Sequence, residues 1–266
     1  MLSEKLAGRD HRAVFAHDEE NFLYPDAYEV DFDKEAEVDA EGLTGPQVNR
    51  KIRELMRNGY GHIIVLNPGA KHSLGCGILN RLKLTFKGSL GYFGCGLNDG
   101  PNIHITGRVG WGCGENMMAG TVLIEKNAGS SFGAGFRGGD LVCKGDVGGR
   151  TGISMKGGTI LVGGRTGYLS GFMMQRGRMI ILGDAEENLG DSMYDGTIYV
   201  GGKIKSLGID AVPGEMTDAD VAWLSRKLKM YGMEAPNGVE NIQKIVAGKK
   251  LWNYDSLEPS EKKIVL

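Results

Sequence analysis

Residues 152–202 contain the pattern that decides the fold: GISMKGGTILVGGRTGYLS, GFMMQRGRMIILGDAEENL and GDSMYDGTIYVGG. Written one under another, the three lines begin at Gly152, Gly171 and Gly190, which lie 19 residues apart. Each line carries a methionine three residues later and a second glycine six residues later. A unit that recurs at a fixed period of about 20 residues is typical of a solenoid. The repeat therefore indicates the fold more strongly than any local pattern of secondary structure does.

The same unit can be followed back to residue 75. The first marker glycines are Gly75, Gly94, Gly112, Gly133, Gly152, Gly171 and Gly190. The second marker glycines are Gly100, Gly120, Gly139, Gly158, Gly177 and Gly196, with Arg81 in the corresponding region of the first unit. A bulky apolar residue stands between the markers: Ile78, Leu97, Met117, Phe136, Met155, Met174 and Met193. Of the 44 glycines in the 266 residues, 34 fall within residues 74–208, so the glycine excess belongs to the repeat.

A short alternating run follows each second marker, as in residues 159–162, 178–181 and 197–200. Such runs indicate strands, and the glycines that close them permit the positive φ of a sharp turn. A unit of 19 residues cannot bury a face alone, but coils stacked about 4.8 Å apart pair every strand with its neighbour. The repeat therefore predicts an all-β protein, a parallel β-helix of about seven coils over residues 74–208, with three short strands to each coil.

Three other glycine-rich folds are excluded by spacing. Hexapeptide solenoids need an 18-residue coil, calcium-binding nonapeptide rolls need an Asp at a constant position in every turn, and collagen needs glycine at every third residue. None of these periods occurs in the marker units.

The flanking segments predict caps for the two ends of the solenoid. In residues 43–73 a helix begins after Thr44, places Val48, Ile52 and Met56 on one face, and precedes a strand over residues 62–66. In residues 209–266 the pattern predicts a helical extension, with one helix over residues 218–231 and a shorter one over residues 237–247.

The first 42 residues form an acidic arm. Its carboxylates are Asp18, Glu19, Glu20, Asp26, Glu29, Asp31, Asp33, Glu35, Glu37, Asp39 and Glu41. Such a run has little core of its own and is usually solvated; the alternative is that it lies along a basic surface of a partner.

The paired form Gly-x-Gly resembles a known family. It occurs at residues 75–77, 94–96, 112–114 and 133–135, and is followed by a bulky residue and Gly-Gly-x-Ile-x-Val. This pattern resembles the GXGXG domain of the glutamate synthase large subunit, and it is similar to the related β-helix subunits of N-methylglutamate synthase and of formylmethanofuran dehydrogenase. The resemblance covers about residues 43–208 and implies a right-handed parallel β-helix.

The resemblance also implies a function. In the glutamate synthase assembly a glutaminase module and a module with FMN and an iron-sulfur cluster carry the chemistry, while the β-helix carries none. We therefore expect a non-catalytic scaffold subunit in a hetero-oligomer, with no cofactor of its own, and with glutamine amidotransferase-type and FMN/iron-sulfur partner subunits. One alternative is the β-helix subunit of a formylmethanofuran dehydrogenase or of a formyltransferase/hydrolase complex; another is a free carbohydrate-active β-helix enzyme.

Charge and hydropathy exclude two classes of partner. A formal net charge of −2 gives no general attraction for nucleic acid. No run of residues approaches the roughly 18 apolar residues that a membrane span requires, and residues 1–8 are too polar for a secretory signal. We therefore expect a cytoplasmic protein that binds neither nucleic acid nor a membrane.

No catalytic constellation emerges from the motifs, and each candidate residue also has a purely structural interpretation. Counted from the first marker glycines, Cys76, Cys95 and Cys113 occupy the same position in three consecutive coils. There they either fill a narrow ladder of the core or hold a metal ion or part of a cluster. His62, His72 and His104 are too scattered for a ligand set. Asp184, Asp191 and Asp195 suggest either turn roles or a carboxylate cleft. A basic set near the first coils is either solvated or an interface: Arg50, Lys51, Arg53, Arg81, Lys83, Lys87 and Arg108.

Overall fold

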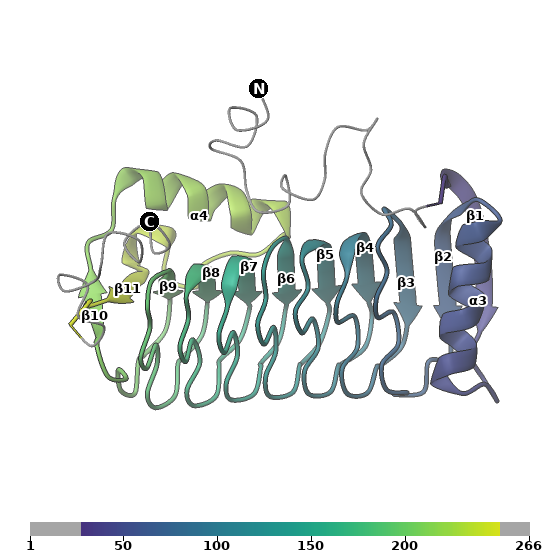
Figure 1. Cartoon of the computed structure of the whole chain (residues 1–266). Coiled ribbons are helices and arrows are strands. Elements are labelled where there is room, and N and C mark those ends of the chain that lie inside the picture. Colours follow the sequence, from purple (N-terminus) through teal and green to yellow (C-terminus); the bar gives the residue numbers. More distant parts are fainter. Residues whose placement is uncertain (1–27, 251–266) are drawn as a thin grey trace, which may run out of the picture.

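The computed structural model describes residues 28–250 and shows a rod of stacked coils (Figure 1). Neighbouring strands along the rod are parallel. They are β2 (Tyr60–Leu66), β3 (Lys83–Lys87), β4 (Asp99–Ile105), β5 (Ala119–Ile124), β6 (Asp140–Cys143), β7 (Lys156–Val162), β8 (Arg176–Ile181) and β9 (Thr197–Val200). The predicted parallel β-solenoid of about seven turns is confirmed, with two α-helices among the described residues.

Two ladders of inward side chains form the core of the rod. The first ladder is Ile63, Leu84, Ile103, Val122, Leu141, Ile160, Met179 and Ile198. The second is Val65, Phe86, Ile105, Ile124, Cys143, Val162, Ile181 and Val200. All are buried, because successive residues of a strand alternate between the inside and the outside of the coil.

The remainder of each coil consists of turns, where three strands per coil were expected. Ser154 and Met173 have φ of 52°, and each donates its backbone N–H to the next coil, to Phe172 at 2.8 Å and to Asp191 at 2.9 Å. Residues in the left-handed region cannot belong to a strand, but they bend the chain while keeping the hydrogen bonds between coils. Outside the strands, isolated parallel β-bridges such as the one between Val109 and Ala128 also pair neighbouring coils.

The N-terminal end is capped by helix α3 (Gly45–Arg57) and strand β1 (Asp31–Asp39), which pairs in parallel with β2. The helix begins at the predicted position, where the backbone N–H of Thr44 donates to the side chain of Gln47 at 2.8 Å, and it buries its apolar face. Residues 31–39 of the acidic arm are more than a solvated run. Most of their side chains are exposed, as expected, but their backbone extends the sheet by one strand. Residues 1–27 lie outside the described residues.

The C-terminal end differs from the prediction in one element. Helix α4 (Asp218–Met230) forms as expected, but residues 237–247 form a short 3-10 turn, η2 (Val239–Asn241), and a strand, β11 (Gln243–Ala247), where a helix was predicted. β11 lies between β9 and β10 (Ala211–Gly214) and is antiparallel to both. The open edge of the last coil offers hydrogen-bond partners that override the local helical preference. Residues 251–266 lie outside the described residues.

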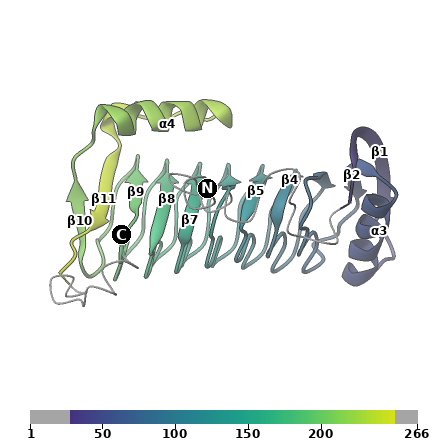
Figure 2. The same cartoon turned by 45° about the horizontal axis from the view of Figure 1, so that its top comes forward.

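Helix α4 covers the outer face of the last coils (Figures 1 and 2). Outward residues Val142, Leu161 and Ile180 are 0% exposed because Leu224 and Leu228 of the helix pack onto them in a second, smaller core. No helix within residues 28–250 has the length and apolar character needed to cross a bilayer.

Candidate functional site

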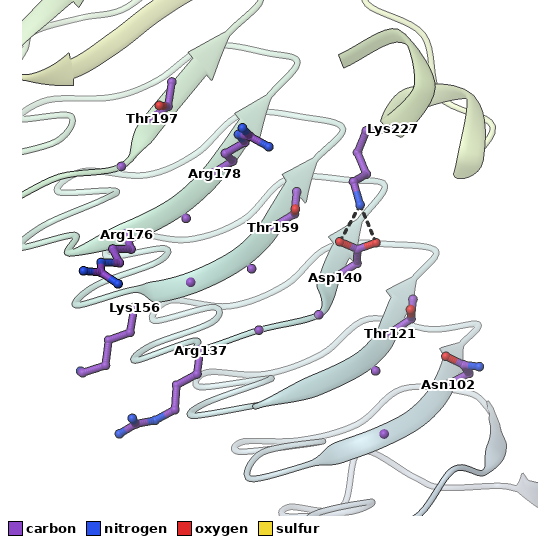
Figure 3. A pocket seen from close by; sticks show the side chains of 18 of the residues that line it. Asn102, Thr121, Arg137, Asp140, Lys156, Thr159, Arg176, Arg178, Thr197 and Lys227 are labelled. Carbon is purple, nitrogen blue, oxygen red and sulfur yellow. Dashed lines mark hydrogen bonds and ion pairs between the residues drawn. The ribbon is translucent and has the colours of Figure 1, made fainter. Parts of the chain in front are cut away.

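A groove of about 950 Å³ runs along the outside of the rod, past the end of α4 (Figure 3). Glycines form its floor: Gly100, Gly120, Gly139, Gly158, Gly177 and Gly196. All have positive φ, between 72° and 110°. These are the second marker glycines, so the repeat that winds the coils also leaves a strip of backbone without side chains.

The floor glycines are required by coil stacking. A Cβ on Gly158 would lie 2.6 Å from the ring of Phe136 and 2.8 Å from the carbonyl oxygen of Gly139 in the preceding coil. A Cβ on Gly120 would overlap the carbonyl oxygen of Pro101. The glycines are therefore explained by the fold, and the groove follows from their lack of side chains.

The two walls of the groove carry different side chains. Arg137, Lys156 and Arg176 lie on one side, on successive coils (Figure 3). A ladder of strand residues lies on the other: Asn102, Thr121, Asp140, Thr159, Arg178 and Thr197. Within residues 28–250 the lining includes six cationic residues, completed by Arg81 and Lys227, against the two acids Asp140 and Asp195. The groove is therefore strongly positive on a chain of net charge −2.

Polar contacts hold α4 at the rim of the groove. The ammonium group of Lys227 lies 2.9 Å from the carboxylate of Asp140, which also accepts a hydrogen bond from the hydroxyl of Tyr231. Both side chains of the ion pair are 16% exposed, so the contact is well shielded from water. The guanidinium of Arg178 lies 4.4 Å from the ring centre of Trp223, a cation–π contact.

A second anchor lies at the start of the helix. Asp220 accepts from the ammonium group of Lys244 at 2.8 Å and from the hydroxyl of Tyr199 at 2.6 Å. It also closes the capping box with Thr217. Burial by itself raises the pKa of Asp220, but these hydrogen bonds together hold that pKa below its ordinary value. The carboxylate is therefore a structural anion that fixes α4 to the sheet.

The three marker cysteines do not share one ladder position, and this expectation is corrected by the hydrogen-bond register. The N–H of Cys95 donates to the carbonyl of Leu74 at 2.9 Å, in the same way that the N–H of Gly133 donates to the carbonyl of Cys113 at 2.9 Å. Cys95 therefore occupies the marker position of its coil, Cys113 precedes the marker of its own coil, and Cys76 follows the marker of the first.

The surroundings of Cys76, Cys95 and Cys143 raise the pKa of these three thiols. Cys95 and Cys113 are 0% exposed, and the adjacent Cys113 thiol, followed by burial, raises the pKa of Cys95 well above its ordinary value. Burial raises the pKa of Cys76, and it raises that of Cys143 to about 12. Within residues 28–250 no group of three His, Cys, Asp or Glu side chains could hold a metal ion.

The histidines lie apart, each with its own partner. His62 Nδ1 lies 2.8 Å from a Glu35 carboxylate oxygen, and His104 Nε2 lies 2.9 Å from Glu125. His72 Nδ1 accepts from the backbone N–H of Tyr92 at 2.9 Å.

The three aspartates are likewise dispersed. Asp184 accepts from the N–H of Lys203 at 2.7 Å, and Asp191 accepts from the N–H of Ile209 at 3.1 Å, so both support turns between coils. Asp195 lines the groove, which places it alone of the three at the candidate site.

The sequence-based basic set coincides with the groove at one residue, Arg81. The cations Arg137, Lys156 and Arg176 were missed, although a signal was present. Each stands immediately before the glycines of a second marker, at steps of 19 and 20 residues. Like charges within one residue of the same phase lie on one side of a solenoid, and the register shift between β7 and β8 pairs Lys156 with Arg176.

Comparisons with known proteins find a partial relative. No family model matches the chain. Protein GlxC from Rhizobium meliloti (strain 1021) is 40% identical over 60 residues. That match covers 23% of this chain and 26% of GlxC, so the chain spans about a quarter of this relative's length. The similarity thus extends over 60 residues, about the length of three coils.

Proposed function

We propose that this chain is a non-catalytic scaffold subunit of a glutamate synthase-type or N-methylglutamate synthase-type complex. Its partners would be a glutamine amidotransferase-type subunit and a subunit that binds FMN and an iron-sulfur cluster. Support comes from the likeness of its glycine repeat to the GXGXG domain and from the partial match to Protein GlxC.

The observation that carries the proposal is the continuous hydrogen-bonded stack from β1 to β10. Strands β2 to β9 pair in parallel one after another, with register shifts at Asp99–Asn102 and at Lys156–Thr159. The N-terminal end is closed by β1 with α3, and the C-terminal end by the antiparallel pair of β10 and β11. Coils that each contact their neighbours through ladders on several sides resist bending. Such a rod suits a part that holds two catalytic subunits at a fixed separation.

The environments of the candidate reactive groups agree with this role. The Cys95 and Cys113 thiols lie in the core, while His62 and Asp184 have partners that serve pairing between coils. The described lining of the groove consists mainly of charged side chains, threonines and glycine backbone.

The test is purification of the tagged full chain from its native cell at its natural level. We expect two further subunits in constant ratio, identified by mass as glutaminase-type and flavin-binding proteins, with flavin absorbance co-eluting. Partners of the formyltransferase and amidohydrolase type would replace this proposal by the formylmethanofuran alternative. A chain that elutes alone and turns over a carbohydrate by itself would refute the scaffold role.

A further inference from the structure

We propose that the cationic groove is a binding site for an extended acidic segment of another polypeptide chain. The proposal goes beyond the scaffold role and does not depend on which complex the chain joins. It stands on the distribution of charge along the groove, the shape of the floor and the chemistry of the walls.

The charges are spread along the rod. Arg81 lies before β3, Arg137 before β6, Lys156 and Arg176 at the starts of β7 and β8, and Arg178 within β8. At about 4.8 Å per coil, the lining from β3 to β9 covers roughly 29 Å. A small anion reaches two coils at most, whereas an extended peptide of about nine residues spans the whole length. The ligand that matches the groove is therefore elongated.

Like charges on one wall of the groove also repel one another. Arg137, Lys156 and Arg176 occupy successive coils on one wall (Figure 3), so their side chains start about 5 Å apart. The Debye length at physiological salt is about 8 Å, so neighbouring charges at this spacing are incompletely screened. Carboxylates placed along the groove relieve that repulsion.

The walls and floor favour a peptide over other elongated anions. Single-stranded nucleic acid is held by a cationic groove together with stacking on aromatic rings, but the middle of this groove is lined by glycines, threonines and charged residues. The two aromatic lining residues are already engaged by cations: Lys83 lies 5.7 Å from the ring centre of Phe32, and Arg178 lies 4.4 Å from that of Trp223.

The remaining wall suits a peptide backbone. The strand ladder presents Asn102, Thr121, Thr159 and Thr197, which both donate and accept hydrogen bonds, on the same face of the rod (Figure 3). The bare glycine floor lets a main chain approach closely. An acidic polypeptide in extended conformation therefore finds cations for its side chains on one wall and polar groups for its backbone on the other.

The experiment is fluorescence anisotropy with the full chain and a labelled peptide of alternating Glu and Ala, about ten residues long, the length that the groove accommodates. We expect saturable binding that weakens at least several-fold when salt is raised from about 0.05 M to about 0.3 M. The matched Gln-Ala peptide should not bind. Equal binding of both peptides would overturn the proposal.

Two full-chain variants of equal charge change locate the site. Substituting Arg137→Gln, Lys156→Gln and Arg176→Gln should weaken peptide binding about tenfold or more, since each exposed pair contributes a few-fold. Substituting Arg50→Gln, Lys51→Gln and Arg108→Gln, which are exposed cations outside the groove, should change binding less than about twofold. Equal loss in the two variants would refute a localised site. Because all six positions are at the surface, both variants are expected to fold, and single Arg137→Glu gives an independent check.

Competing occupants are separated in the same assay. Binding of a single-stranded oligothymidylate of about ten nucleotides more tightly than the acidic peptide would show a nucleic-acid site and overturn the proposal. A full chain that binds the peptide only after Asp18→Asn, Glu19→Gln, Glu20→Gln and Asp26→Asn would assign the groove to this chain's own acidic residues, which also overturns it. None of these binding measurements uses co-purified partners. Failure of the groove proposal can therefore be distinguished from failure of the proposed scaffold role.

Discussion

Replacement of a floor glycine by alanine tests whether coil stacking requires the repeat glycines. At Gly158 the backbone has φ of 72°, which costs an L side chain about 1–2 kcal/mol. The added Cβ also lies 2.6–2.8 Å from three atoms, two of which are backbone atoms of the preceding coil and cannot rotate away. Opening the coils to relieve that overlap strains the hydrogen bond from Thr159 N–H to the Gly139 carbonyl, now 2.9 Å. Overpacking of this kind costs about 1–3 kcal/mol and the hydrogen bond about 1 kcal/mol more, so Gly158→Ala should lose about 3–6 kcal/mol in total.

Gly232→Ala is the matched control. Gly232 follows α4 with φ of 62°, but a Cβ there meets nothing within 4 Å, so only the conformational cost of about 1–2 kcal/mol applies. Urea unfolding followed by far-UV circular dichroism and by tryptophan fluorescence measures both variants. The two should differ by about 2–4 kcal/mol, with a lower melting temperature for Gly158→Ala by roughly 5–15 °C. Equal destabilisation of the two variants would refute the argument that coil stacking requires these glycines.

The contacts of α4 and of the core lead to three more expected outcomes. Leu224→Ala, at a side chain that is 0% exposed, should reduce the free energy of unfolding by about 2–4 kcal/mol, whereas Met230→Ala, at a side chain that is 66% exposed, should stay within about 0.5 kcal/mol in the same urea titration. Asp220→Asn should reduce the free energy of unfolding at neutral pH. Because the pKa of Asp220 in the folded chain lies below the ordinary 3.8, the stabilisation by its carboxylate is present above pH 3.8 and is lost as the pH falls through the folded pKa. A difference in stability between the variant and the parent chain that persisted below the folded pKa would contradict this argument. Alkylation of Cys95 and Cys113 by iodoacetamide, followed by mass spectrometry, should appear only in urea concentrations that unfold the rod, and labelling of the native chain would contradict their burial.

The register of the first coils shows where sequence reasoning went wrong. Requiring a glycine at every first marker selected Gly94 and Gly112, with uneven steps of 19, 18 and 21. A constant step of 19 counted back from Gly133 instead passes through Gly114 and Cys95, and the hydrogen bonds confirm this register. Cys95 has φ of 59°, so the coil accepts a non-glycine residue in the left-handed region at this position.

The outer face of the last coils is apolar, but the local sequence pattern does not identify the element that covers it. Val142, Leu161 and Ile180 point outward and are apolar, which indicates that something covers them. Residues 218–231 carry a matching apolar stripe, but neither pattern states that the two faces meet. Likewise, residues 243–247 become a strand because an unpaired sheet edge lies beside them, and that edge exists only after the coils have stacked.

The solenoid, its period and its number of coils could be predicted from the residues alone, because a repeat imposes the same local geometry on every unit and neighbouring units can only stack. The same holds for α3 and α4, whose caps and apolar stripes are local. Three-dimensional packing was needed to show which side of the rod collects Arg137, Lys156 and Arg176, where α4 packs, and how the glycine markers become the floor of a groove. These features depend on which residues of different coils come to share a face, and a one-residue change in coil length moves every side chain to another face.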